Sequence, residues 1–144
     1  MATNPMFTLF DATARESEKF CRAFFQEIDA RRAPPSISEG TTIVWNGTPL
    51  AGAQTFQEMV TQSPNMSHEV TCLDVHPFPN GDAHALNMIV STSGKVKLGL
   101  TDKENNFAFS AQLVVRRPHA QAPLLLQTMS YRLVHQPTTT TIQF

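Results

Sequence analysis

The chain has 144 residues and a mass of 16.0 kDa, a size that fits one globular domain. Hydrophobic residues make up 41% and charged residues 16% of the sequence, which supports a packed core and argues against a disordered chain. The net charge is −1, from 11 Lys and Arg against 12 Asp and Glu, and this balance excludes a protein that grips nucleic acid mainly through a strongly basic surface.

The two cysteines, Cys21 and Cys72, are too few to stabilise a small secreted domain, and we interpret them as free intracellular thiols. No run of about 18 apolar residues is present, so we expect no membrane contact. The apolar stretch at 6–10 is too short for a signal peptide. These features favour a cytoplasmic or nuclear protein.

The first predicted element is a long helix over about residues 8–32. Phe20, Phe24 and Ile28 recur at positions i, i+4 and i+8, which places them on one side of a helix. The Pro-Pro pair at 34–35 cannot continue a helix, so we expect it to end near residue 32.

A short hairpin and a second helix are predicted next. The run at 41–45 is β-branched and aromatic, and Asn46-Gly47 after it is a strong signal for a two-residue hairpin turn. A short return arm follows at 49–51. Residues 55–60 then read as a short helix, which Ser63-Pro64 stops.

Beyond residue 67 the hydrophobic period changes to 2, which predicts four long antiparallel strands at about 67–78, 83–98, 106–117 and 124–135. Asn80-Gly81 predicts a tight turn, and Gly94 predicts a bulge or bend, as a curved sheet requires. This order of elements predicts an α+β fold with one domain over 1–136 and a flexible tail over 137–144.

The last two predicted strands have two different faces. One face is apolar and is expected to lie in the core: Phe107, Phe109, Ala111, Leu113, Met129, Tyr131 and Leu133. The other face carries small, hydroxyl and amide residues with a single arginine: Ala108, Ser110, Gln112, Val114, Thr128, Ser130 and Arg132. A face of this moderate polarity is either a solvated sheet surface or a protein-binding surface.

Asp74 and His76 are the strongest candidates for chemistry. They lie two residues apart and so share a strand face, and the same alternation adds Cys72 and His68 to that face. A carboxylate and an imidazole can serve as a general acid and base, but the same residues also suit ordinary hydrogen bonding near a strand end. Their spacing does not match a closed zinc site, and no phosphate-binding or dinucleotide motif is present, so we expect no metal and no cofactor.

The basic residues form short, scattered pairs. Lys95, Lys97, Arg116 and Arg117 are interpreted as solvated ends of strands that make at most a weak contact with RNA.

Several segments resemble the nuclear transport factor 2-like family, and within it the small cofactor subunits of the heterodimeric general mRNA export receptor. The most specific are Asp29-Ala30-Arg31-Arg32 at the end of a long helix and Thr42-Ile43-Val44-Trp45-Asn46-Gly47 after it, followed by Gly52 and Phe56. Further similar segments are 24–25, 70–74, 94–98, 107–112 and 131–133. The resemblance covers roughly residues 11–136.

The resemblance implies a cone-shaped fold, with helices packed in the hollow of a curved antiparallel sheet. It also implies a non-catalytic subunit that pairs, sheet face to sheet face, with the related domain of the large receptor subunit. Such a heterodimer supports messenger ribonucleoprotein export through the nuclear pore. It binds phenylalanine-glycine nucleoporins as a complex, contacts RNA indirectly or weakly, and shuttles between nucleus and cytoplasm.

The predicted partner interface is the moderately polar sheet face: Arg132, Ser130, Thr128, Gln112, Ser110 and Val114. Arg132 is the only charge among these residues, and its planar guanidinium suits a bidentate carboxylate on the partner. The matching arginine of the resembled family lies at the sheet-to-sheet contact. The alternative is a small cavity enzyme of the same fold, isomerase- or dehydratase-like, that uses Asp74 and His76.

Overall fold

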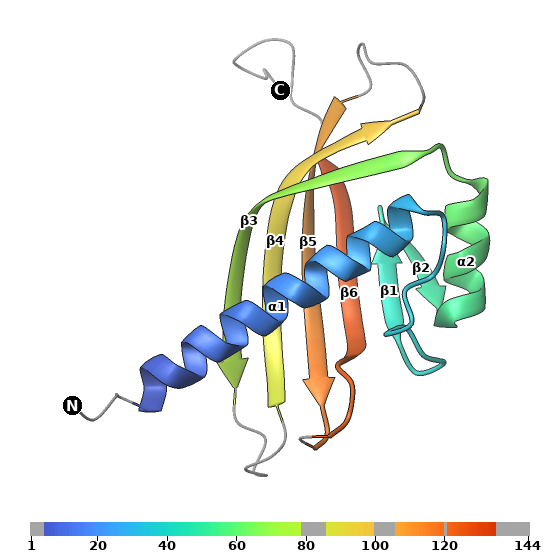
Figure 1. Cartoon of the computed structure of the whole chain (residues 1–144). Coiled ribbons are helices and arrows are strands. Elements are labelled where there is room, and N and C mark those ends of the chain that lie inside the picture. The colour runs from blue at the N-terminus through green and yellow to red at the C-terminus, as the bar shows by residue number, and fades with distance from the viewer. Residues whose placement is uncertain (1–4, 79–85, 100–105, 120, 135–144) are drawn as a thin grey trace, which may run out of the picture.

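The computed structural model describes residues 5–78, 86–99, 106–119 and 121–134. The elements are α1 (Pro5–Asp29), β1 (Thr42–Trp45), β2 (Thr48–Ala51), α2 (Gly52–Gln62), β3 (Met66–Phe78), β4 (Leu86–Leu98), β5 (Asn106–Arg117) and β6 (Leu125–Val134). The strands form one sheet in the order β2-β1-β6-β5-β4-β3. The sheet is curved, α1 runs diagonally across it, and α2 lies beside the β1–β2 hairpin (Figure 1).

This arrangement confirms the predicted α+β class and the nuclear transport factor 2-like fold. The four long strands are antiparallel neighbours, as predicted, but β1 pairs with β6 in parallel, so the sheet is mixed. The β1–β2 hairpin follows α1 in the chain and extends the sheet at the edge formed by β6. The predicted turn at Asn80-Gly81 and the predicted tail at 137–144 lie outside the described residues.

The helices are found where the sequence predicts them, with shifted ends. Helix α1 ends at Asp29, before the predicted residue 32, and Arg31 after it has a positive φ of 64°, which a continuing helix does not permit. Helix α2 starts at Gly52, directly after β2, and Gly52 has a φ of 81° that favours glycine. No helix in the described part of the chain is long and apolar enough to cross a membrane.

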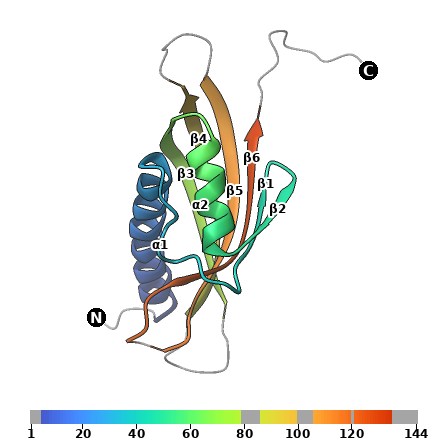
Figure 2. The same ribbon diagram turned by 90° about the vertical axis from the view of Figure 1, so that its right-hand side faces the viewer.

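The core lies between α1 and the concave face of the sheet. Phe24, Phe25 and Ile28 of α1 are buried there against Phe109 and other side chains of the sheet. Burying one such side chain contributes about 1.5–3 kcal/mol, so this apolar stripe holds the helix in the hollow. Both helices lie on the same side of the sheet, and no described element covers its convex face (Figure 2).

Gly94 lies at the bend in the sheet, although the extra residue of the bulge is on the neighbouring strand. The register between β3 and β4 shifts between Val70 and Cys72, opposite Gly94. A Cβ atom on Gly94 would lie 1.9 Å from the carbonyl oxygen of Glu69, so only glycine allows the two backbones to approach this closely. The inserted residue reverses the alternation of side chains along the rest of β3.

Candidate partner interface and the buried polar network

The six predicted interface residues form one continuous block on the convex face of the sheet. Cross-strand pairing sets Ser110 beside Arg132, Gln112 beside Ser130 and Val114 beside Thr128. Val114 is half-buried and the other five side chains are exposed. Alternation along β5 and β6 was therefore sufficient to predict which face these residues occupy.

The same face continues onto strands that the sequence analysis did not include. On one side, Thr42 and Val44 of β1 pair with Thr128 and Ser130. On the other, Ile89, Ser91 and Ser93 of β4 pair with Val114, Gln112 and Ser110. The missed residues share the alternation, but their place beside β5 and β6 depends on strand order, which the sequence does not reveal.

Arg132 is the one cation within the block formed by β5 and β6 at residues 110–114 and 128–132. Its side chain is exposed, and within the described residues no hydrogen bond or ion pair engages its guanidinium. Its cross-strand neighbour, Ser110, is neutral. The guanidinium therefore has all of its donors available for an anion from outside the chain.

The backbone on both sides of Arg132 is held by Asn46. The backbone N–H of Asn46 donates to the carbonyl oxygen of Tyr131 (2.8 Å), and the side-chain Oδ1 of Asn46 accepts from the N–H of Leu133 (2.7 Å). Asn46 adopts a positive φ of 51° in the β1–β2 turn, a conformation that asparagine tolerates better than most residues. The Asn-Gly turn thus closes the hairpin and also restrains the strand that carries Arg132.

A buried polar network lies on the opposite, concave side. Nδ1 of His68 is 2.6 Å from Oδ1 of Asp29, and Nε2 of His68 is 2.6 Å from the hydroxyl of Tyr131. The backbone N–H of His68 also donates to Oδ2 of Asp29 (2.8 Å). These contacts join α1, β3 and β6 across the hollow of the sheet.

Aromatic rings enclose this network. The ring of Trp45 stacks on Tyr131 with centroids 3.8 Å apart and planes 2° from parallel. Phe25 and Phe109 pack against His68, with centroids at 4.8 and 5.0 Å. Burial, aided by the charge of Asp29, raises the pKa of Tyr131 well above its ordinary value, so this hydroxyl stays neutral in the folded protein.

The structure corrects the predicted grouping of His68 with Asp74, His76 and Cys72. His68 points into the core, where its side chain has no exposed area, whereas Asp74 and His76 are exposed beyond the bulge. Because the bulge in β3 reverses the alternation, residues before and after it do not share the predicted face. An uninterrupted period of 2 along β3 predicts the wrong face for His68, so the Asp29–His68–Tyr131 network is not evident from the sequence.

Asp74 and His76 line neither of two cavities that the described residues form. One cavity, of about 660 Å³, lies between α1 and the segments at 34–36 and 123–125. A second, of about 350 Å³, lies beside Asp29 and His68. Neither includes the predicted acid–base pair. Within the described residues no three His, Cys, Asp or Glu side chains are grouped to hold a metal ion.

The four basic residues predicted to contact RNA do not form one patch. Lys95 and Lys97 lie near one end of β4, whereas Arg116 pairs with Asn87 near its other end. Asn87 and Lys95 are eight positions apart, about 26 Å at ~3.3 Å per residue. Arg117 makes a bidentate ion pair with Glu16 at 2.7 and 3.2 Å.

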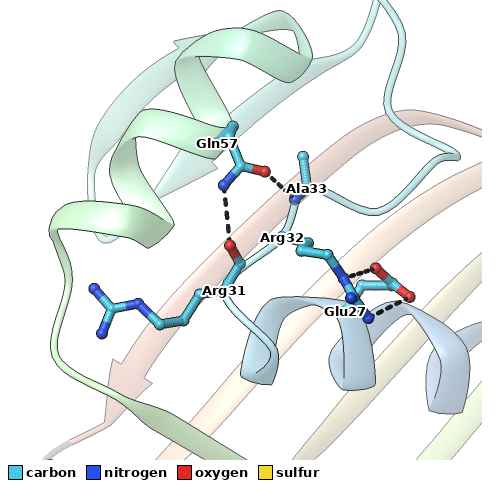
Figure 3. A network of polar contacts seen from close by, with 5 residues as sticks. All are labelled: Glu27, Arg31, Arg32, Ala33 and Gln57. Atoms are coloured by element: carbon cyan, nitrogen blue, oxygen red, sulfur yellow. Dashed lines mark hydrogen bonds and ion pairs between the residues drawn. The ribbon is translucent and has the colours of Figure 1, made fainter.

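The Asp-x-Arg-Arg segment connects the two helices. Figure 3 shows the side chain of Gln57 in α2 donating to the carbonyl of Arg31 (2.9 Å) and accepting from the N–H of Ala33 (2.8 Å). Arg32 pairs with Glu27, and the guanidinium of Arg31 donates to Asn65 (2.7 Å) and to the carbonyl of Thr61. This motif therefore has a structural role, and its aspartate belongs to the buried polar network.

Comparison with known proteins agrees with this architecture. The human NTF2-related export protein 2 is 27% identical over 119 residues, which cover 78% of this chain and 84% of that protein. A solved structure of the Mtr2–Mex67 M domain complex of C. albicans matches with a TM-score of 0.68 and 18% identity, over 89% of this chain and 99% of the matched chain. Nuclear transport factor 2 from Cryptosporidium parvum matches with a TM-score of 0.62 and 18% identity, over 92% of this chain and 98% of that chain.

The family described as nuclear pore RNA shuttling protein Mtr2 matches residues 11–122, which include most of α1, the β1–β2 hairpin, α2 and strands β3 to β5. That span is well over half of the sequence. The chain therefore belongs to the Mtr2 family of nuclear pore RNA shuttling proteins.

Proposed function

We propose that this chain is the small, non-catalytic subunit of an mRNA export heterodimer and binds the related domain of the large receptor subunit through its convex sheet face. The family supports a role in export, and the related complex of C. albicans pairs Mtr2 with the M domain of Mex67. The observation that carries the proposal is the uncovered block on β5 and β6 with an unengaged arginine in it.

The chemistry of the block suits a protein partner. Serine, threonine and glutamine side chains are neutral and desolvate at lower cost than charges, and the half-buried Val114 adds apolar area. Interfaces between proteins typically have charge-depleted centres in which arginine is enriched. A face built only for solvation would carry more lysine and glutamate.

Arg132 is proposed as the anchor of this interface. A partner carboxylate placed over the face would meet a guanidinium that has no competing acid among the residues beside it. Once the interface excludes water, a bidentate pair of this kind is stronger than the same pair in solvent.

The non-catalytic assignment is supported by accessibility. Tyr131 and the side chain of His68 have no exposed area and bond to each other, and within this network only the side chain of Asp29 is partly exposed, beside the second cavity. Asp74 and His76 are exposed on β3, and neither of the two cavities described above encloses them to exclude water.

At the level of the complex, we propose that the heterodimer carries messenger ribonucleoprotein between nucleus and cytoplasm and binds phenylalanine-glycine nucleoporins at the pore. The separated basic residues support only weak contact between this subunit and RNA. The residues proposed for such a contact are Lys95, Lys97, Arg116 and Arg117, and Arg117 also pairs with Glu16.

The proposal is tested by co-expressing this chain with the large receptor subunit and measuring the mass of the purified complex by light scattering. A stable 1:1 complex is expected, with well over about 1,000 Å² buried in total. A soluble, folded chain that shows no affinity for the large subunit would overturn the proposal.

A further inference from the structure

We propose that Tyr131 is a positioning residue for Arg132, so that the buried chain Asp29–His68–Tyr131 sets how tightly the convex face binds its partner. This inference rests on the proposed heterodimer and adds a determinant of affinity that does not itself touch the partner. It begins from the order of the residues on β6, where Tyr131 points into the core and Arg132, the next residue, points out.

The ring of Tyr131 is restrained by two nearly parallel aromatic rings and by a hydrogen bond at its hydroxyl. Trp45 stacks on one side of it at 3.8 Å, and Phe109 lies nearly parallel to it with its centroid at 5.7 Å and an interplanar angle of 12°. Stacking alone allows a ring to slide in its own plane. The hydrogen bond from the hydroxyl to His68 opposes that sliding, because it fixes the far end of the ring.

His68 can hold the ring because it is itself held. Asp29 engages both its Nδ1 and its backbone N–H, at 2.6 and 2.8 Å, so the imidazole cannot rotate without breaking the Nδ1 contact, and the backbone bond holds the carboxylate in place. The anchor lies on α1, outside the sheet. The position of Tyr131 is therefore fixed by α1, through His68 and Asp29, as well as by its neighbouring strands.

Restraint matters most at this point of β6 because the parallel partner strand ends here. The last pair between β1 and β6 is Trp45 with Tyr131. Arg132 is the first residue beyond it, and on that side, within the described residues, the two hydrogen bonds with Asn46 support the strand. A shift of Tyr131 in the core would therefore change the direction in which Arg132 leaves the sheet.

A double-mutant cycle with the intact large subunit tests the inference. Affinities are measured by calorimetry for the wild type, Tyr131→Phe, Arg132→Ala and the combination. Tyr131→Phe keeps the stacked ring and loses only the hydroxyl. We expect it to weaken binding about tenfold in the Arg132 background and less than about twofold in the Arg132→Ala background, because its effect passes through the arginine.

A matched control separates this effect from a general loss of core hydrogen bonding. Ser17→Ala also removes a fully buried hydroxyl, but that hydroxyl bonds to the carbonyl of Ala14 within α1 and is not part of the Asp29–His68–Tyr131 chain. It should leave affinity within about twofold of the wild type. His68→Asn keeps a donor toward Asp29 and loses the bond to Tyr131. If Tyr131→Phe folds poorly, His68→Asn takes its place and should likewise weaken binding more in the Arg132 background than in the Arg132→Ala background.

The inference would be overturned if Tyr131→Phe lowered the affinity equally in the Arg132 and Arg132→Ala backgrounds, or did not lower it in the Arg132 background. The proposed heterodimer would stand in either case. If the wild type forms no complex, the proposed function fails, and hydrogen exchange of the isolated chain still tests positioning. Tyr131→Phe should then speed exchange of the Leu133 amide at least about tenfold relative to Ser17→Ala. An unchanged rate would exclude any positioning role.

Discussion

The hydroxyl of Tyr131 lies 2.6 Å from Nε2 of His68, although the two residues are 63 positions apart and their strands are separated by β4 and β5 in the sheet. A flat sheet would keep these side chains well over 10 Å apart, since neighbouring strands are about 4.8 Å apart. The curvature around α1 and the bend in β3 bring them together. Tyr131 therefore makes this contact in the core, on the concave face of the sheet, while Arg132, the next residue of β6, lies on the convex face.

Arg132→Ala should weaken binding to the large receptor subunit by roughly 2–5 kcal/mol, because a partner carboxylate would be left buried without its counter-charge. Arg132→Glu should weaken it further, since it places two acids together. Calorimetry on variants shown to be folded by circular dichroism measures the effect. Arg22→Glu, the same charge change on the exposed side of α1, is the control and should bind normally. Normal binding by Arg132→Glu would place the interface elsewhere.

His68→Ala should lower the free energy of unfolding by about 3 kcal/mol, because it opens a cavity and leaves Asp29 and Tyr131 without their shared partner. Urea unfolding followed by fluorescence of the single tryptophan, Trp45, measures this change. His76→Ala, on the exposed side of the same strand, should change stability by no more than about 0.5 kcal/mol. Similar losses for the two variants would contradict the structural role of the network.

Gly94→Ala should destabilise the protein by about 2 kcal/mol or more, because the new Cβ would lie 1.9 Å from a backbone oxygen of Glu69 that cannot move independently of β3. Gly40→Ala is the matched control, since a Cβ there meets nothing within 4 Å. Thermal unfolding of both variants provides the comparison. If the melting temperatures of Gly94→Ala and Gly40→Ala are the same, the close approach of β3 and β4 at Gly94 is contradicted.

Cys72 should react rapidly with an aromatic disulfide reagent at neutral pH, and Cys21 only after unfolding. Cys72 is exposed on β3, whereas burial raises the pKa of the Cys21 thiol to about 12, which removes the nucleophilic thiolate. Counting released thiolate before and after adding denaturant measures both. Rapid loss of two thiols from the native protein, or an equal rate in Cys72→Ser, would contradict the prediction.

Tyr131 should make the folded protein less stable in alkali. In the unfolded chain it loses its proton near its ordinary pKa of 10.0, whereas burial and the charge of Asp29 raise its pKa in the folded state. Its stabilising contribution is therefore complete below about pH 10 and is lost above it, at up to about 1.4 kcal/mol per pH unit.

The chain contains one tyrosine, so phenolate absorbance reports this residue alone. The absorbance should appear together with unfolding, as followed by circular dichroism, and the Tyr131→Phe variant should lose stability less steeply with rising pH. In denaturant the same residue should titrate near its ordinary pKa. A phenolate that forms near pH 10 in the folded protein would show that the hydroxyl is accessible.

Local pattern determined much of this protein. The 3.6-residue period around Phe24 and Ile28 and the alternation on β5 and β6 located the helix and both faces of the last strands, because burial on one side imposes that pattern directly. The turn at Asn46-Gly47 was also predicted from the sequence, since a two-residue type I′ hairpin turn needs positive φ at both positions.

Only the tertiary structure decided which residues meet in the buried polar network and which residues lie beside Arg132. The inserted residue in β3 turned His68 inward and Asp74 outward, and an alternation counted along the chain cannot register one added residue. The parallel pairing of β1 with β6 set Asn46 beside Arg132, and Asp29 reached His68 because α1 crosses the hollow. These contacts join distant segments, so their geometry follows from strand order and curvature, which are properties of the whole packed sheet.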